Sequence, residues 1–193
     1  MHDDVGASLT QIALLSDLAI RGNGVPTMTQ TNLNKIALRA RSAVRSIDEI
    51  VWTVSPQHDN LASLVEYVSR HFDGYLQGSG IRCVQNLPDQ IDSRALPSEF
   101  RYNLFLILSE GVQNIVKHSQ ATTATLTIVH QVDDLLRVSV SDDGIGFVEN
   151  QSPTGDGLRN MRERADALGA KLQLTSVVGQ GCVLHLEVPL PQG

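Results

Sequence analysis

The chain has 193 residues, 41% of them hydrophobic, and a formal net charge of −6, which allows one domain or two small ones with a core. The acidic balance argues against direct binding to nucleic acid, because the phosphate backbone attracts basic surfaces. No apolar run approaches the roughly 20 residues that span a bilayer, so we expect a cytoplasmic chain without membrane contact. In the reducing cytosol we expect Cys83 and Cys182 to be buried thiols, and a structural disulfide is the alternative.

Residues 5–54 predict two long amphipathic helices separated by a short loop at 22–26. Apolar side chains recur in both at spacings of three and four, which is the period of one helix face. They are Val5, Leu9, Ile12, Leu15 and Leu18, then Leu33, Ile36, Ala40, Val44, Ile47, Val51 and Val54. A two-helix hairpin leaves this stripe uncovered, so we expect residues 1–57 to form a four-helix bundle as a homodimer.

His2 and Asp3 lie at the start of the first helix, at the edge of its apolar stripe. An imidazole beside a carboxylate is a candidate nucleophile, because the carboxylate can orient the ring and raise its basicity. The spacing alone leaves open an exposed histidine with no chemical role. Metal binding is disfavoured, since no second His or Cys is near.

Residues 58–193 alternate helices with short strands and predict an α/β sandwich, one sheet covered on one face by helices. The expected helices are 61–76, 100–118 and 158–168. The expected strands, mostly antiparallel, are 81–87, 123–129, 135–140, 172–177 and 182–188. Residues 55–59 interrupt the helical pattern with a proline and mark the domain boundary. The predicted fold class is therefore α+β, a helical hairpin domain over 1–57 followed by a sandwich domain over 58–193.

The expected helix at 100–118 carries polar side chains inside an apolar run. Glu110, Asn114 and Lys117 or His118 follow one another at spacings of three or four, so they share one side. A carboxylate and an amide oxygen are ligands that Mg²⁺ accepts, and Lys117 or His118 can meet phosphate charge. A merely solvated helix face is the alternative.

Two glycine pairs follow a strand and precede a helix. Asp142–Gly146 reads Asp-Asp-Gly-Ile-Gly, and Gly155–Leu158 reads Gly-Asp-Gly-Leu. Glycine lets backbone approach a ligand closely, and a helix N-terminus offers unpaired N–H groups to phosphate. Together with the polar side of the preceding helix, these turns predict a nucleotide site.

These motifs resemble those of the ATPase superfamily that contains histidine kinases, gyrase and Hsp90. Glu110–His118 is similar to its N box, Asp142–Gly146 and Gly155–Leu158 to its two glycine boxes, and Gly179–Pro189 to its closing strand. His2–Gly6 is similar to the His-Asp motif of two-component sensor kinases that pair with helix-turn-helix response regulators. The resemblance covers nearly the whole chain.

The resemblance implies an ATP-dependent protein-histidine kinase. His2 would attack the γ-phosphate with Asp3 as the adjacent base, and the phosphoryl group would pass to an aspartate of a response regulator. Asn114 and Glu110 would hold Mg²⁺, and Glu110 would also act in catalysis as a carboxylate that polarises or orders water. Asp142 would accept a hydrogen bond from the adenine amine.

The resemblance also implies further ATP-binding positions. Gly144 and Gly146 would turn tightly under the base, and Gly155 and Gly157 would hinge a lid over the phosphates. In addition to Asn114 and Asp142, the predicted ATP-binding residues are Lys117, His118, Gly144, Gly146, Gly155, Gly157 and Leu158.

Three positions depart from the family pattern. Ala7 stands where glutamine commonly supports dephosphorylation of the regulator, and Cys182 stands where threonine is usual. His2 follows a single residue, so we expect the transmitter part of a longer protein, anchored to a membrane through an upstream sensor. Two other functions stay open: an ATP-binding dimerisation module without autokinase activity, and an anti-sigma-type serine/threonine kinase.

Overall fold

The computed structural model describes Ile12, Leu14, Ile36, Ala40 and residues 59–130, 134–148 and 156–191. The chain divides into two compact units, 1–55 and 56–193. The four described positions of the first unit are helical, and the rest of the predicted hairpin lies outside the described residues. Within the described part, every helix is too short or too polar to cross a membrane.

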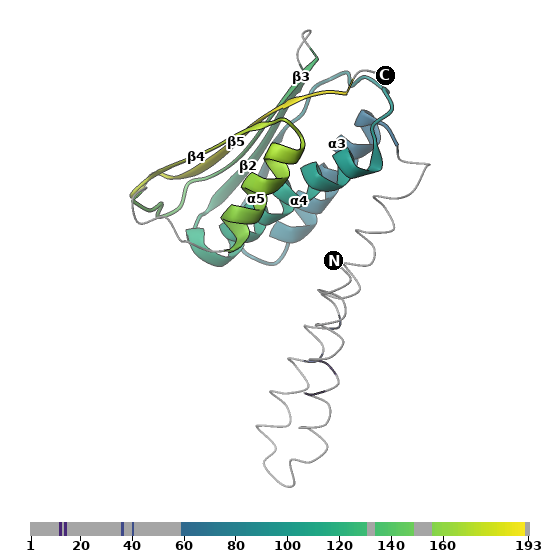
Figure 1. The fold of residues 1–193 in the computed structure, drawn as a ribbon. Coiled ribbons are helices and arrows are strands. Elements are labelled where there is room, and N and C mark those ends of the chain that lie inside the picture. The colour runs from purple at the N-terminus through teal and green to yellow at the C-terminus, as the bar shows by residue number, and fades with distance from the viewer. Residues whose placement is uncertain are drawn as a thin grey trace. The chain divides into compact units, whose positions relative to one another are not determined.

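The second unit is an α/β sandwich, as predicted, with helices on one face of a five-stranded sheet (Figure 1). In chain order its elements are α3 (Leu61–Leu76), β1 (Arg82–Asn86), α4 (Ser98–Asn114), the π-helical turn η2 (Ile115–Ser119), β2 (Thr123–His130), β3 (Leu135–Asp142), α5 (Asp156–Ala167), β4 (Lys171–Val177) and β5 (Gly181–Pro189). The strand order is β1-β2-β3-β5-β4; β1 runs parallel to β2 and the other pairs are antiparallel.

The core lies between the helices and the inner face of the sheet. Alternate residues of β2, β3 and β5 point inward, as period-two strands require. The buried ones are Ala124, Leu126, Ile128, Leu136, Val138, Val140, Leu184, Leu186 and Val188. On the helix side, α4 packs between α3 and α5, and Phe72 and Phe105 are almost entirely buried. Helix α4 therefore forms the centre of the layer that covers the sheet.

The predicted helix over 100–118 changes character at its C-terminal end. The α-helical part stops at Asn114, and residues 115–119 form a π-helical turn that ends at Gln120 with a φ of +54°. Such widened turns are rare and are frequently found at functional sites. The turn places Ser119 in a buried position at the start of the connection to β2.

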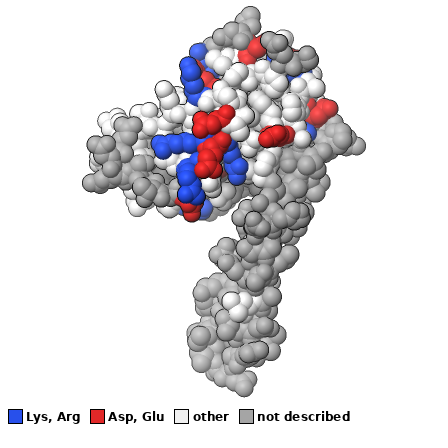
Figure 2. Space-filling model, in the orientation of Figure 1, with Lys and Arg blue, Asp and Glu red and all other residues white. Residues whose placement is uncertain are grey.

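Charged side chains of both signs lie side by side over α5 (Figure 2). Arg159 pairs with Asp156 at 2.8 Å and with Glu163 at 3.7 Å. A nucleic-acid interface needs a continuous basic surface, and this face of the molecule carries a mixed one.

Candidate nucleotide site

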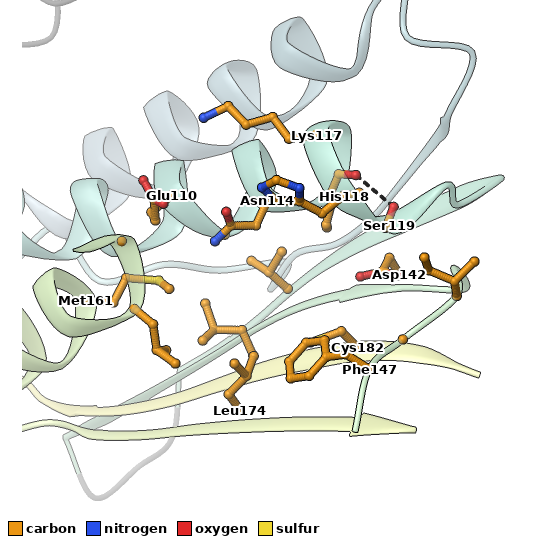
Figure 3. A pocket seen from close by; sticks show the side chains of 18 residues that line it. Glu110, Asn114, Lys117, His118, Ser119, Asp142, Phe147, Met161, Leu174 and Cys182 are labelled. Carbon is orange, nitrogen blue, oxygen red and sulfur yellow. Dashed lines mark hydrogen bonds between the residues drawn. The ribbon is translucent and has the colours of Figure 1, made fainter. Parts of the chain in front are cut away.

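A cavity of about 300 Å³ lies between α4, the start of α5 and the inner face of the sheet (Figure 3). The predicted site residues that line it are Glu110, Asn114, Lys117, His118, Asp142, Gly146, Gly157 and Leu158. Gly144 does not line the cavity, but it follows β3 and its N–H donates to Asp142, which does. His2, Asp3 and Gly155 lie outside the described residues. The described parts of the three predicted boxes therefore meet at one cavity.

The wall of the cavity is mostly apolar and comes from positions that were not predicted as site residues. They are Ile115, Val140, Ile145, Phe147, Met161, Leu174 and Leu184, together with Cys182. Several are inward-facing strand residues, so strand alternation indicates their direction but not the unfilled space above them. A largely apolar slot with a few polar groups is typical of a small-molecule site.

Asp142 is the carboxylate at one end of this slot, and Glu110 lies toward the other end (Figure 3). The backbone N–H of Gly144 donates to Asp142 Oδ1 at 2.9 Å. Burial raises the pKa of the Asp142 carboxyl above its ordinary value, and hydrogen bonds from the backbone of Gly144 and Cys182 oppose that rise. The carboxylate is thus held in place with acceptor capacity left for a ligand.

Cys182 lies next to Asp142 in the slot. Burial, followed by the charge of Asp142, raises the pKa of this thiol to about 11, so the group is uncharged at neutral pH. Both cysteines are free thiols, as predicted, but each is half-buried rather than buried. The polar end of the slot therefore carries one negative charge from Asp142 and a neutral thiol beside it.

The first glycine pair packs its loop against the protein's own backbone. A β-carbon at Gly144 would lie 2.1 Å from the carbonyl oxygen of Ser119, an oxygen that accepts from the N–H of Ile145 at 2.8 Å. Gly146 has a φ of +58°, and a β-carbon there would lie 2.1 Å from the carbonyl oxygen of Val177. These glycines let the loop close against the π turn and the β4–β5 turn, a role that the sequence did not predict.

Asp143 differs from its neighbour Asp142 in every contact. It is exposed, and its carboxylate accepts from the hydroxyl of Thr122 at 2.7 Å and from the backbone N–H groups of Thr122 and Thr123. These bonds, led by the one from the Thr122 hydroxyl, lower the pKa of Asp143 to about 2. Asp143 therefore ties β3 to the start of β2 and leaves the slot to Asp142.

Glu110 and Asn114 lie one turn apart on α4 and both line the cavity. One Glu110 oxygen lies 2.1 Å from where a Gly157 β-carbon would be, so the carboxylate reaches the first turn of α5. Among the described residues no group of three or more His, Cys, Asp or Glu side chains is placed to hold a metal. Two oxygen donors do fit Mg²⁺ when phosphate oxygens and water supply its other ligands.

Lys117 and His118 lie on the π turn, at the exposed rim of the cavity. The Lys117 ammonium donates to Gln113 Oε1 at 3.1 Å. The side chain extends back along α4 in the direction of Glu110 (Figure 3). Its positive charge therefore lies toward the Glu110 end of the slot, away from Asp142.

Comparison with known proteins agrees with this arrangement. Residues 101–192 match the family described as histidine kinase-, DNA gyrase B-, and HSP90-like ATPase. The whole chain aligns, at 32% identity, with the signal transduction histidine-protein kinase/phosphatase UhpB of Salmonella typhimurium, and it spans 37% of that relative's length.

Two solved structures share the fold. The histidine kinase domain of the blue-light activated histidine kinase EL346 from Erythrobacter litoralis has a TM-score of 0.59 at 21% identity, covering 94% of this chain and 96% of that one. Full-length ShkA, solved in complex with AMPPNP, has a TM-score of 0.63 at 15% identity, covering 98% of this chain and 45% of ShkA.

Proposed function

Because the chain belongs to the two-component sensor histidine kinases and carries their ATPase domain, we propose that it binds ATP beneath α4 and transfers the γ-phosphoryl group to His2. One observation carries the proposal: a single slot joins an apolar wall to Asp142 at one end and to the Glu110–Asn114 pair at the other. A nucleotide has the matching order of groups, an aromatic base followed by a chain of phosphates.

The base end of the slot suits adenine. The Asp142 carboxylate accepts hydrogen bonds only, so it pairs with the exocyclic amine of adenine and would repel the carbonyl oxygen that guanine has there. Phe147 and Leu174 offer apolar surface to the ring. The neutral Cys182 thiol adds no second charge, so Asp142 determines the polarity of this end.

The phosphate end is built on α4 and the start of α5. Glu110 and Asn114 would hold Mg²⁺, which when bound neutralises phosphate charge. Lys117 and His118 line the rim and face the same phosphates. The N-terminus of α5, at Gly157, lies against Glu110 and adds the positive end of a helix dipole. Phosphoryl transfer needs such positioning and charge neutralisation more than elaborate chemistry.

The acceptor is His2, with Asp3 as the group that orients its ring. One imidazole nitrogen of His2 forms the N–P bond as the bond between the γ-phosphorus and the bridging oxygen breaks, and ADP leaves. The proton on the other ring nitrogen passes to Asp3, the adjacent base. The phosphoryl group then passes to an aspartate of a response regulator, for which the sensor-kinase relative UhpB is the support. We propose that residues 1–57 bring two chains together as a homodimer and that residues 58–193 form the ATP-binding domain.

UhpB is named as both a kinase and a phosphatase. Ala7 lacks the side-chain amide that commonly supports the phosphatase reaction in this family, so we propose the kinase reaction alone. We propose that this response regulator carries a helix-turn-helix output domain.

The proposal is tested by incubating the chain with γ-labelled ATP and Mg²⁺. Label is expected on the wild type and absent from His2→Gln, which keeps the rest of the chain intact. Asn114→Ala is expected to lose label through loss of nucleotide, and a thermal shift with ATP separates the two causes. Label retained on His2→Gln would overturn the assignment of the acceptor.

A further inference from the structure

We propose that Gln113 is a positioning residue, held by Ser109 and His71, that keeps the Lys117 ammonium directed at the phosphates of the bound nucleotide. The inference rests on the ATP site proposed above. Gln113 lies inside the N box but was given no role there, and Ser109 and His71 lie outside all three boxes.

A continuous row of hydrogen bonds runs from α3 to the rim of the cavity. His71 Nε2 lies 3.1 Å from Ser109 Oγ, Gln113 Nε2 donates to the same oxygen at 3.3 Å, and Lys117 Nζ donates to Gln113 Oε1 at 3.1 Å. Residues 109, 113 and 117 are four apart, so they follow one side of the helix from turn to turn. Only Lys117, the last of them, lines the cavity.

The Gln113 amide has one orientation that satisfies both of its neighbours, Ser109 and Lys117. A glutamine amide has a donor end and an acceptor end. Because its NH₂ group donates to Ser109, its carbonyl oxygen faces Lys117. The opposite orientation would place an NH₂ group against an ammonium, where two sets of donors repel. Because the Ser109 hydroxyl can accept or donate, Lys117, which only donates, selects this orientation, and the bond to Ser109 anchors the amide in it.

The inner end of the row is anchored in the core. Ser109 is 3% exposed, and a buried hydroxyl needs hydrogen-bond partners, which His71 and Gln113 provide. The His71 ring lies edge-on to Phe105, with 4.8 Å between ring centroids, and next to Tyr67 and Tyr75. Because Phe105 is 1% exposed, its buried ring fixes the position of His71, where the row of hydrogen bonds begins.

Lys117 is the kind of group that needs such support. It is an exposed lysine, and a free lysine side chain samples many rotamers, whose loss on binding opposes affinity. Holding the ammonium at Gln113 in advance removes part of that loss, as preorganisation does generally.

The holding group is neutral, which matters for phosphate. Among the described residues no carboxylate forms an ion pair with Lys117, so Gln113 orients the ammonium without cancelling its charge. An acid at position 113 would pair with Lys117 and compete with the nucleotide. The amide thus provides direction and leaves the full charge for the phosphates.

The test is a double-mutant cycle on nucleotide affinity, measured by calorimetry with ATP and with adenosine. Gln113→Leu removes the acceptor and keeps the side-chain size. We expect it to weaken ATP binding about 3- to 10-fold, the value of one hydrogen bond, and to leave adenosine binding unchanged. In a Lys117→Ala background the same change is expected to have no further effect, because Gln113 acts through Lys117.

Two further variants sharpen the result. Gln113→Glu is expected to weaken ATP binding as well, through competition for Lys117. Ser109→Ala is expected to weaken it in the same direction, because the Gln113 amide loses the bond that anchors it. Ser109→Ala also serves if Gln113→Leu does not fold. An unchanged ratio of ATP to adenosine affinity in Gln113→Leu, tighter ATP binding, or an additive loss in the double variant would overturn the inference.

The outcomes also separate this inference from the function on which it rests. A wild-type chain that binds neither ATP nor adenosine would contradict the proposed function. A wild-type chain that binds both, with Gln113→Leu preserving their ratio, would contradict the role of Gln113 alone.

Discussion

The Glu110 carboxylate occupies the space that a side chain at Gly157 would need. One of its oxygens lies 2.1 Å from the β-carbon position of Gly157. Glu110 belongs to the C-terminal half of α4 and Gly157 to the first turn of α5, so the contact joins the two helices that border the cavity. The second glycine box therefore has a steric role, which is to let Glu110 reach the start of α5.

Gly157→Ala is expected to displace the Glu110 side chain and weaken binding of ATP with Mg²⁺ on the order of tenfold, as loss of one charged contact would, while adenosine binding holds. Gly74→Ala is the matched control, because that helical glycine has open space around it. It is expected to leave ATP affinity unchanged and to stabilise α3 by about 0.5–1 kcal/mol. Calorimetry measures the ATP affinity of both variants, and urea unfolding measures their stability. Wild-type ATP affinity in Gly157→Ala would contradict it.

Asp142→Asn is expected to raise the stability of the fold and to lower its affinity for ATP. Burial raises the pKa of Asp142, so its charge destabilises the fold above that pKa and ceases to do so as the pH falls through it. The amide keeps the shape without the charge, so the melting temperature at pH 7 should rise, and the gain should shrink on acidification. ATP affinity should fall about ten- to hundredfold, as expected for a hydrogen bond to a charged group. A variant that binds ATP normally would contradict the role of Asp142.

Asp143→Asn is expected to lower the stability of the fold. The pH dependence of its effect is opposite to that of Asp142→Asn. The folded pKa of Asp143 is about 2 against an ordinary value of 3.8, so its contribution is complete above about pH 4 and is lost as the pH falls toward 2. Urea midpoints should be lower for the variant at pH 7, and the gap to the wild type should close between about pH 4 and 2. A gap that stays constant over that window would show that another mechanism is responsible.

Gly146→Ala is expected to destabilise the fold more than Gly169→Ala. Both glycines have a left-handed backbone, with φ of +58° and +63°, which an alanine adopts at a loss of about 1 kcal/mol. A β-carbon at Gly169 meets open space, whereas one at Gly146 would lie 2.1 Å from the Val177 carbonyl oxygen. Denaturant unfolding of both measures the difference, and equal losses would refute the steric argument. Only Gly146→Ala should also reduce ATP affinity, since the Asp142 loop must move.

The elements of residues 59–191 were predictable because each carries a clear period. The ends of α3, α5 and the strands differ from the predicted ones by no more than two residues. Two features were not predicted. The switch from α to π geometry at Ile115 changes hydrogen-bond register without changing the apolar pattern. The parallel pairing of β1 with β2 depends on where α4 returns the chain, which no local pattern encodes.

The sequence predicted the polar residues of the site. It did not predict the parts of the site that depend on tertiary contacts. Glu110, Asn114 and Asp142 belong to local motifs, and all three line the cavity. The closure of the Gly144 loop on Ser119 joins residues 25 positions apart, and the link from His71 to Ser109 spans 38. Nothing in the local sequence indicates either contact, because each is created when α4 packs beside α3 and over the sheet.

The central claim is that the γ-phosphoryl group of ATP arrives on a histidine. The most direct measurement is the chemical stability of the label on chain incubated with γ-labelled ATP and Mg²⁺. A phosphohistidine on His2 predicts label that survives alkali, is released by acid and is missing from His2→Gln. Acid-stable label would instead indicate a serine or threonine kinase, and ATP binding without any label would indicate a nucleotide-binding dimerisation module. Either result would contradict the assignment of a histidine kinase.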